Sequence, residues 1–293
     1  MTAINSSNEG KACDAILRHI EARDGHTRSE LAFPEKTHDV GPVELICAVG
    51  PRRYAFEHTR IEPFVGHIQL EAEAERHFQP LSEMVAGKLP SDDRFELHLP
   101  FGALLGKHDR EVRPIQQALA EWIIATAPTL PIAAIGRVVL PVQKVSVLGV
   151  PFAVSLHRWK RDGFPVPFQV GHLVKSDTEP ERVARIKVTY DKKLGKLLKW
   201  RAKGARTVLI LEEDDIQLTN HFRVGDALIN IEATVTERPD EVYLLSTANS
   251  VWFAVLLRID DMSFYDLPVE DRHWKTSPDM LDNITGKRRT AKP

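Results

Sequence analysis

The chain has 293 residues, of which 43% are hydrophobic and 27% charged, so it is long enough and apolar enough to bury a sizeable core. Its formal net charge of -2 gives no overall attraction for nucleic acid, so any such contact has to come from a local basic patch. Two cysteines exclude a disulfide framework and a four-cysteine zinc site. Without a long apolar stretch or a signal-peptide pattern, we expect a cytoplasmic protein with no membrane partner.

The N-terminal part of the chain predicts one helix followed by a β-hairpin. Residues 1–9 are polar and predict a disordered N-terminus, whereas the apolar spacing in 10–23 predicts a short helix. The segment 26–42 is polar and interrupted by prolines, which predicts a loop. The apolar runs 43–49 and 53–59 predict two strands, and the Gly-Pro pair between them indicates a tight turn.

The middle of the chain alternates helical and strand patterns. Helical spacing of apolar residues predicts helices over 67–88 and 109–127, and strict alternation predicts a strand at 95–99. Three further strands, separated by Pro and Gly, are predicted at 144–148, 152–159 and 168–174. We interpret residues 143–175 as a β insertion.

The C-terminal part predicts helices that alternate with buried strands. Helical patterns cover 179–203 and 215–232, and apolar strands are predicted at 207–211, 242–245 and 251–259. Residues 271–293 end in a basic, polar stretch that predicts a solvated tail. We therefore expect one α/β domain over 10–270, in which helices flank a mixed β-sheet that carries the middle insertion.

Glu44 and Glu57 each interrupt an apolar strand of the predicted hairpin. Antiparallel pairing brings the start of the first strand toward the end of the second, so the two carboxylates can meet at one end of the sheet. Two oxygen ligands on rigid strands suit Mg²⁺ (or Mn²⁺), with waters completing the coordination. The alternative is that both glutamates face solvent on a half-exposed hairpin.

These residues carry a resemblance to a known family. Pro42-Val43-Glu44, followed by Glu57-His58-Thr59, resembles the acidic residue, spacer and Glu-x-Lys arrangement of the PD-(D/E)XK nucleases, and the phrase from Tyr54 to Phe64 is similar to one in uncharacterised bacterial members. The order of the later elements also follows the family. These are the lysine-rich helix at 179–203, the buried strand at 207–211 and the strand that begins near Asp240. The resemblance implies a restriction-endonuclease-like fold and metal-dependent cleavage of phosphodiester bonds.

The resemblance also assigns roles to residues, with departures. It implies that Glu44, Glu57 and His58 hold the metal ion, His58 through its carbonyl because its ring should point to the other face. Glu44 stands where the family commonly has Asp, and Thr59 stands at the position of the catalytic lysine. Threonine carries no charge to orient a water, so either a lysine of the following helix acts instead, with Lys187, Lys192 and Lys193 as candidates, or the protein is an inactive member that binds nucleic acid or protein.

The helix predicted at 179–203 carries a basic stripe opposite its apolar face. Such a stripe can neutralise phosphates, although a solvated charged face is the alternative. We expect nucleic acid as the partner, DNA in preference to RNA. No P-loop or Rossmann glycine pattern occurs, so no nucleotide cofactor is expected. The stripe consists of Arg185, Lys192, Lys196, Lys199 and Lys203.

Overall fold

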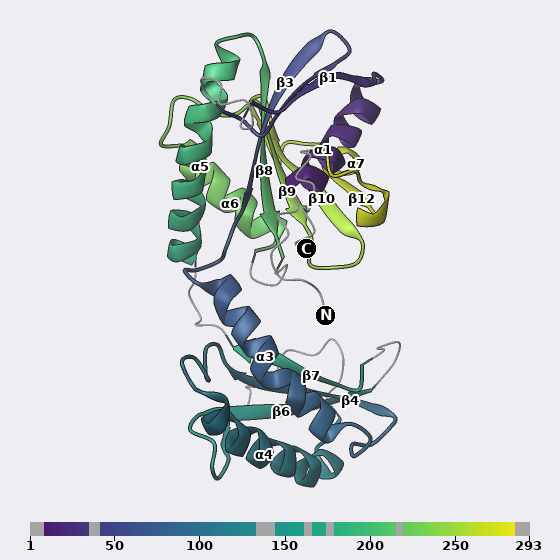
Figure 1. Cartoon of the computed structure of the whole chain (residues 1–293), viewed down its shortest axis with the longest axis vertical. Coiled ribbons are helices and arrows are strands. Elements are labelled where there is room, and N and C mark those ends of the chain that lie inside the picture. The colour runs from purple at the N-terminus through teal and green to yellow at the C-terminus, as the bar shows by residue number, and fades with distance from the viewer. Residues whose placement is uncertain are drawn as a thin grey trace, which may run out of the picture. The chain divides into compact units, whose positions relative to one another are not determined.

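The computed structural model describes residues 9–34, 42–132, 144–160, 166–173, 179–214 and 219–284. The chain divides into two compact units (Figure 1). The large unit comprises Met1–Val65 and Thr178–Pro293, and the small unit comprises Gly66–Asp177. This division differs from the expected single domain over 10–270, because the inserted part begins at Gly66 and includes two helices as well as strands. Each unit is described separately.

The large unit is built on one mixed sheet. Its strand order is β1-β2-β3-β8-β9-β10-β11, with β12 also paired to β10. The central strands β3, β8 and β9 are parallel to one another, whereas β2 and β10 are antiparallel to their neighbours. The strands are β1 (Arg28–Ala32), β2 (Leu45–Val49), β3 (Arg52–Arg60), β8 (Arg206–Glu213), β9 (Glu241–Ser246), β10 (Trp252–Ile259), β11 (Met262–Ser263) and β12 (His273–Thr276).

Helices cover both faces of this sheet. The helix α1 (Glu9–Asp24) lies on one face, while α5 (Glu179–Arg201) and α6 (His221–Glu232) lie on the other (Figure 1). The predicted apolar face of α5 is confirmed, since Ile186, Tyr190, Leu194 and Leu197 are all buried in the core that it shares with α6. The mixed sheet flanked by helices was therefore predicted correctly.

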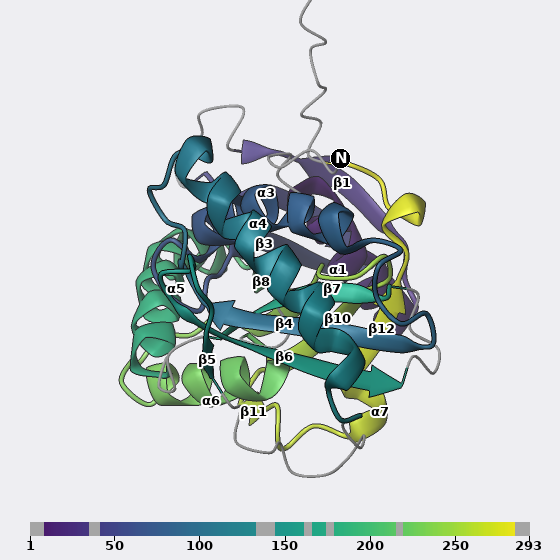
Figure 2. The same ribbon diagram turned by 90° about the horizontal axis from the view of Figure 1, so that it is seen from below.

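The small unit contains a second sheet with the order β5-β6-β4-β7. Alternate residues of β4 are buried, and its apolar side chains pack with those of α3 and α4 in one core (Figure 2). A sheet with one covered face explains the alternation in the sequence. Its elements are α3 (His67–Val85), β4 (Asp93–Pro100), α4 (Asp109–Thr126), a 3-10 helix (Ala127–Thr129), β5 (Val145–Ser146), β6 (Ala153–Lys160) and β7 (Phe168–Leu173).

Two segments of the large unit differ from their predictions. The expected loop over 26–42 contains β1, a polar edge strand that pairs with β2 and has little apolar alternation to reveal it. The expected tail over 271–293 packs on the sheet as far as the structure describes it, through β12 and the buried Leu281. A short helix α7 (Val269–Arg272) precedes β12, and a 3-10 helix (Pro278–Met280) follows it.

Parts of the predicted segments lie outside the described residues, namely 1–8, 35–41, 143, 161–165, 174–175, 215–218 and 285–293. Within the described part of the chain, no helix combines the length and the apolar character that a membrane crossing needs.

Candidate functional site

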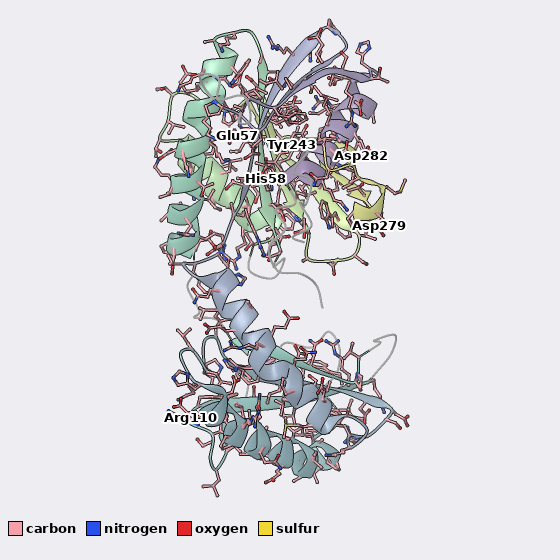
Figure 3. The ribbon with its side chains drawn as sticks, in the orientation of Figure 1. Glu57, His58, Arg110, Tyr243, Asp279 and Asp282 are labelled. Atoms are coloured by element: carbon pink, nitrogen blue, oxygen red, sulfur yellow. The ribbon has the colours of Figure 1, made fainter. Side chains whose placement is uncertain are left out.

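Glu44 and Glu57 lie opposite each other on the hairpin of β2 and β3. The backbone N–H of Glu44 donates to the carbonyl of Phe56 at 3.1 Å, next to the ladder pair Leu45–Phe56. Because side chains alternate along a strand, both carboxylates lie on the sheet face that α5 covers, as does Ile46. Glu44 is 6% exposed and Glu57 is fully buried, so the alternative that both face solvent is wrong. Figure 3 labels Glu57 and its neighbour His58.

A lysine of α5 joins the two carboxylates. The Nζ atom of Lys193 lies 2.8 Å from Oε1 of Glu44 and 2.5 Å from Oε2 of Glu57, which places these two oxygens at most about 5.3 Å apart. Lys193 is one of the three helix lysines that could replace the family's missing lysine. Of these, Lys193 is the one that contacts both acids, whereas Lys187 pairs with Asp191 on the helix surface.

A second lysine and a backbone amide complete the contacts of the two acids. Lys196, one turn further along α5, places Nζ 3.1 Å from Oε1 of Glu57. The backbone N–H of His58 donates to Oε2 of Glu44 at 2.5 Å. Two ammonium groups thus balance two buried carboxylates, which is the condition for burying charge at acceptable cost.

The pKa values reflect this burial. Burial raises the pKa of Glu44 from 4.5 to about 7, and the charge of Glu57 adds to the rise while Lys193 opposes it. Burial likewise raises the pKa of Glu57, again against the attraction of Lys193. Burial lowers the pKa of Lys193, but the attraction of Glu44 and Glu57 outweighs it and leaves that pKa raised. Lys193 therefore remains an ammonium at neutral pH.

The described side-chain contacts of His58 and Thr59 lie away from the two acids. As predicted, the His58 ring lies on the opposite face of β3, where Nε2 is 2.7 Å from Oε2 of Glu212. Thr247 donates its hydroxyl to Oε1 of the same glutamate at 3.2 Å. The Thr59 hydroxyl donates to the carbonyl of Arg60 at 3.4 Å. Its described interactions include none with Glu44 or Glu57. The Glu212 contact was missed, although an acid at the end of a buried strand was a usable signal.

The predicted basic stripe is divided between two environments. Lys196 turns inward to Glu57, whereas Arg185 contacts Glu62 at 3.5 Å while its side chain stays 40% exposed, so neither belongs to the most exposed part of the stripe. The exposed members are Lys192, Lys199 and Lys203.

The carboxylate pair fits some metal ions better than others. Within the described residues, no group of three or more His, Cys, Asp or Glu side chains converges as a metal cage. A structural zinc site needs such a set, whereas Mg²⁺ is commonly held by one or two carboxylates with several waters. Glu44 and Glu57 supply that smaller set of hard oxygen ligands.

Comparisons with known proteins do not place the chain in a family. Searches against protein-family models, curated proteins and solved structures each found no match. The resemblance to the PD-(D/E)XK nucleases therefore stays a prediction that rests on the residues quoted for it and on the order of elements.

Proposed function

We propose that the protein is a metal-dependent nuclease in which Glu44 and Glu57 hold Mg²⁺ or Mn²⁺ and Lys193 replaces the lysine that the family carries at the position of Thr59. The observation that carries the proposal is the convergence of one lysine on two buried carboxylates. The two carboxylates come from paired strands, and the lysine comes from a helix far along the chain. A structural ion pair needs only two residues, whereas three converge here. Clusters of charged groups with shifted pKa values are typical of functional sites.

The order of elements supports the same proposal. One helix precedes a hairpin that carries both acids, and the strand β3 runs parallel to β8, which follows the lysine-bearing α5. This sequence of helix, hairpin, helix and parallel strand is the arrangement that the resemblance to a restriction-endonuclease-like fold implies.

Each residue has a distinct role in this proposal. Bound Mg²⁺ would supply a Lewis acid and an activated water. Glu44 and Glu57 hold charge in a fixed position, since both come from paired strands and the amide of His58 orients Glu44. Lys193 provides a positive charge for the attacking water or the developing charge on phosphate. The exposed lysines 192, 199 and 203 would contact the phosphate backbone.

The test is cleavage of labelled single- and double-stranded DNA and RNA with Mg²⁺ or Mn²⁺. We expect Glu57→Gln to reduce cleavage by at least about a hundredfold while substrate binding is unchanged or tighter, because the change keeps shape but removes the charge that holds the ion. The matched control is Glu121→Gln, an exposed glutamate on α4 of the small unit, which should cleave as wild type does. Equal cleavage by wild type and Glu57→Gln would assign the activity to a contaminant.

A second candidate function is a binding module with a nuclease-like fold and no catalysis. The observation that favours it is Thr59, which has no positive charge and whose described hydroxyl contact is to a backbone carbonyl. This candidate predicts binding of nucleic acid without any cleavage and without dependence on divalent metal. Cleavage that requires both metal and Glu57 would eliminate it.

A further inference from the structure

We propose that the ammonium of Lys193 occupies the cation position between Glu44 and Glu57, so that a divalent metal ion and this lysine compete for the same pair of carboxylates. The inference rests on the proposed function for the metal site and goes beyond it, because it assigns to Lys193 an autoinhibitory contact that metal binding has to break.

The geometry of the ammonium carries this inference. Its Nζ atom lies 2.8 Å and 2.5 Å from one oxygen of each carboxylate, so it bridges the two acids as a shared ion would. A bound Mg²⁺ would approach the same oxygens to about 2.1 Å and carry two positive charges. The ion and the ammonium cannot both hold these two oxygens, because their like charges would lie within a few ångströms of each other.

The surroundings indicate that the lysine is the part that moves. Glu44 and Glu57 come from adjacent paired strands, and the His58 amide holds the second oxygen of Glu44. Lys193 carries its charge on a flexible four-carbon stem, and its side chain remains 13% exposed, which leaves a route to solvent. The acids thus stay in place while the ammonium leaves their two oxygens for a position beside the ion, where its charge still serves the attacking water or the phosphate.

Lys196 provides an internal comparison. It also contacts Glu57, at 3.1 Å, but through Oε1 and without the described bridging contact to Glu44 that Lys193 makes. Removing either lysine removes one positive charge from the neighbourhood of a metal ion. Only the removal of Lys193 frees the position between the two carboxylates. The two variants therefore distinguish competition for that position from the general effect of removing a positive charge on metal affinity.

The test is calorimetric titration of the full chain with MnCl2 in the absence of nucleic acid. We expect Lys193→Met to bind Mn²⁺ at least tenfold more tightly than wild type, and Lys196→Met to gain no more than about threefold. Equal gains in affinity in both variants would mean that only the lost charge matters, and would overturn the inference. The inference would also be overturned if Lys193→Met gained no affinity, or if none of the three proteins bound Mn²⁺. Because cleavage is not measured, failure of the nuclease proposal would not by itself change this result.

A second measurement uses the wild-type protein and does not depend on the folding of a variant. Lysines are acetylated with an N-hydroxysuccinimide ester, and the modification rate of each is followed by mass spectrometry with and without saturating Mn²⁺. We expect Lys193 to react at least fivefold faster with Mn²⁺, while exposed Lys192 keeps its rate. An unchanged rate for Lys193 with Mn²⁺ bound would overturn the inference.

Discussion

Replacement of Lys193 by Met should destabilise the protein strongly in the absence of metal. The side chain contacts two carboxylates, one fully buried and one 6% exposed, and its loss leaves Glu57 with the Lys196 contact and Glu44 with the amide of His58. Removing one partner of a buried ion pair costs roughly 3–5 kcal/mol, because the remaining charge has lost its compensation. That loss is a large share of a typical stability of roughly 5–15 kcal/mol.

A double-mutant cycle isolates the interaction. Glu57→Gln removes one of the two buried charges, so Glu57→Gln/Lys193→Met should be more stable than the sum of the single changes predicts. We expect a coupling free energy of roughly 2 kcal/mol, well above the roughly 0.3–0.5 kcal/mol error of additivity for independent sites.

The loss in Lys193→Met should also depend on pH. The pKa of Glu44 is raised to about 7 in the folded protein, and removal of Lys193, which lowers that pKa, would raise it further. A raised carboxyl pKa means that stability is retained at low pH and falls as the pH rises through the folded value. Lys193→Met should therefore be more destabilised at about pH 8 than at about pH 6.

The assay is urea unfolding followed by tryptophan fluorescence and circular dichroism, for wild type, both single variants and the double variant. A loss below about 1 kcal/mol in Lys193→Met at about pH 8, or additive effects in the cycle, would refute the description of this cluster as a tightly paired buried site.

Two further outcomes follow from other parts of the large unit. If the exposed lysines contact nucleic acid, replacement of Lys192, Lys199 and Lys203 with Gln should weaken binding. It should also flatten the slope of log affinity against log salt concentration by about 2–3. An unchanged slope would mean that these lysines form a solvated face. Burial, together with the charge of Arg23, lowers the pKa of His19 from 6.5 to about 4, and its ring stacks on Trp274 at 3.6 Å. The contribution of His19 to stability should therefore be full above pH 6.5 and be lost toward pH 4. In urea unfolding, wild type should lose roughly 2 kcal/mol relative to His19→Phe between about pH 7.5 and 5, and a difference between the two proteins that does not change with pH would contradict the assignment.

The hairpin with its two acids could be predicted because its signals are local. Strand periodicity of two and a tight turn determine which residues lie opposite each other, so Glu44 and Glu57 could be paired from sequence alone. Their burial could not, because it depends on α5, which follows the hairpin only after the whole small unit.

The choice of lysine shows where sequence reasoning stops. At about 100° per residue, Lys187 and Lys193 each lie about 60° from the centre of the apolar face of α5, on opposite sides, whereas Lys192 lies about 160° away. The helical pattern alone therefore disfavours Lys192. Choosing Lys193 over Lys187 requires the direction of α5 across the sheet and the side on which β2 and β3 lie, and both are tertiary information.

Lys196 was predicted on the solvent side because its backbone position points away from the apolar face. Its long stem nevertheless returns the ammonium to Glu57, as flexible lysines often do. The extent of the small unit was also underestimated: an insertion was predicted over 143–175, whereas the unit comprises Gly66–Asp177. Periodicity identifies helices and strands but does not show which sheet each helix covers.

The most direct test of the candidate site is a crystal structure of the protein with bound Mn²⁺, located by anomalous scattering. We expect one ion between Glu44 and Glu57, with an oxygen of each at about 2.1–2.2 Å and the ammonium of Lys193 displaced from both. An absent anomalous peak at saturating Mn²⁺, with Lys193 still bridging the two carboxylates, would contradict the metal site and leave the three residues as a structural ion-pair cluster.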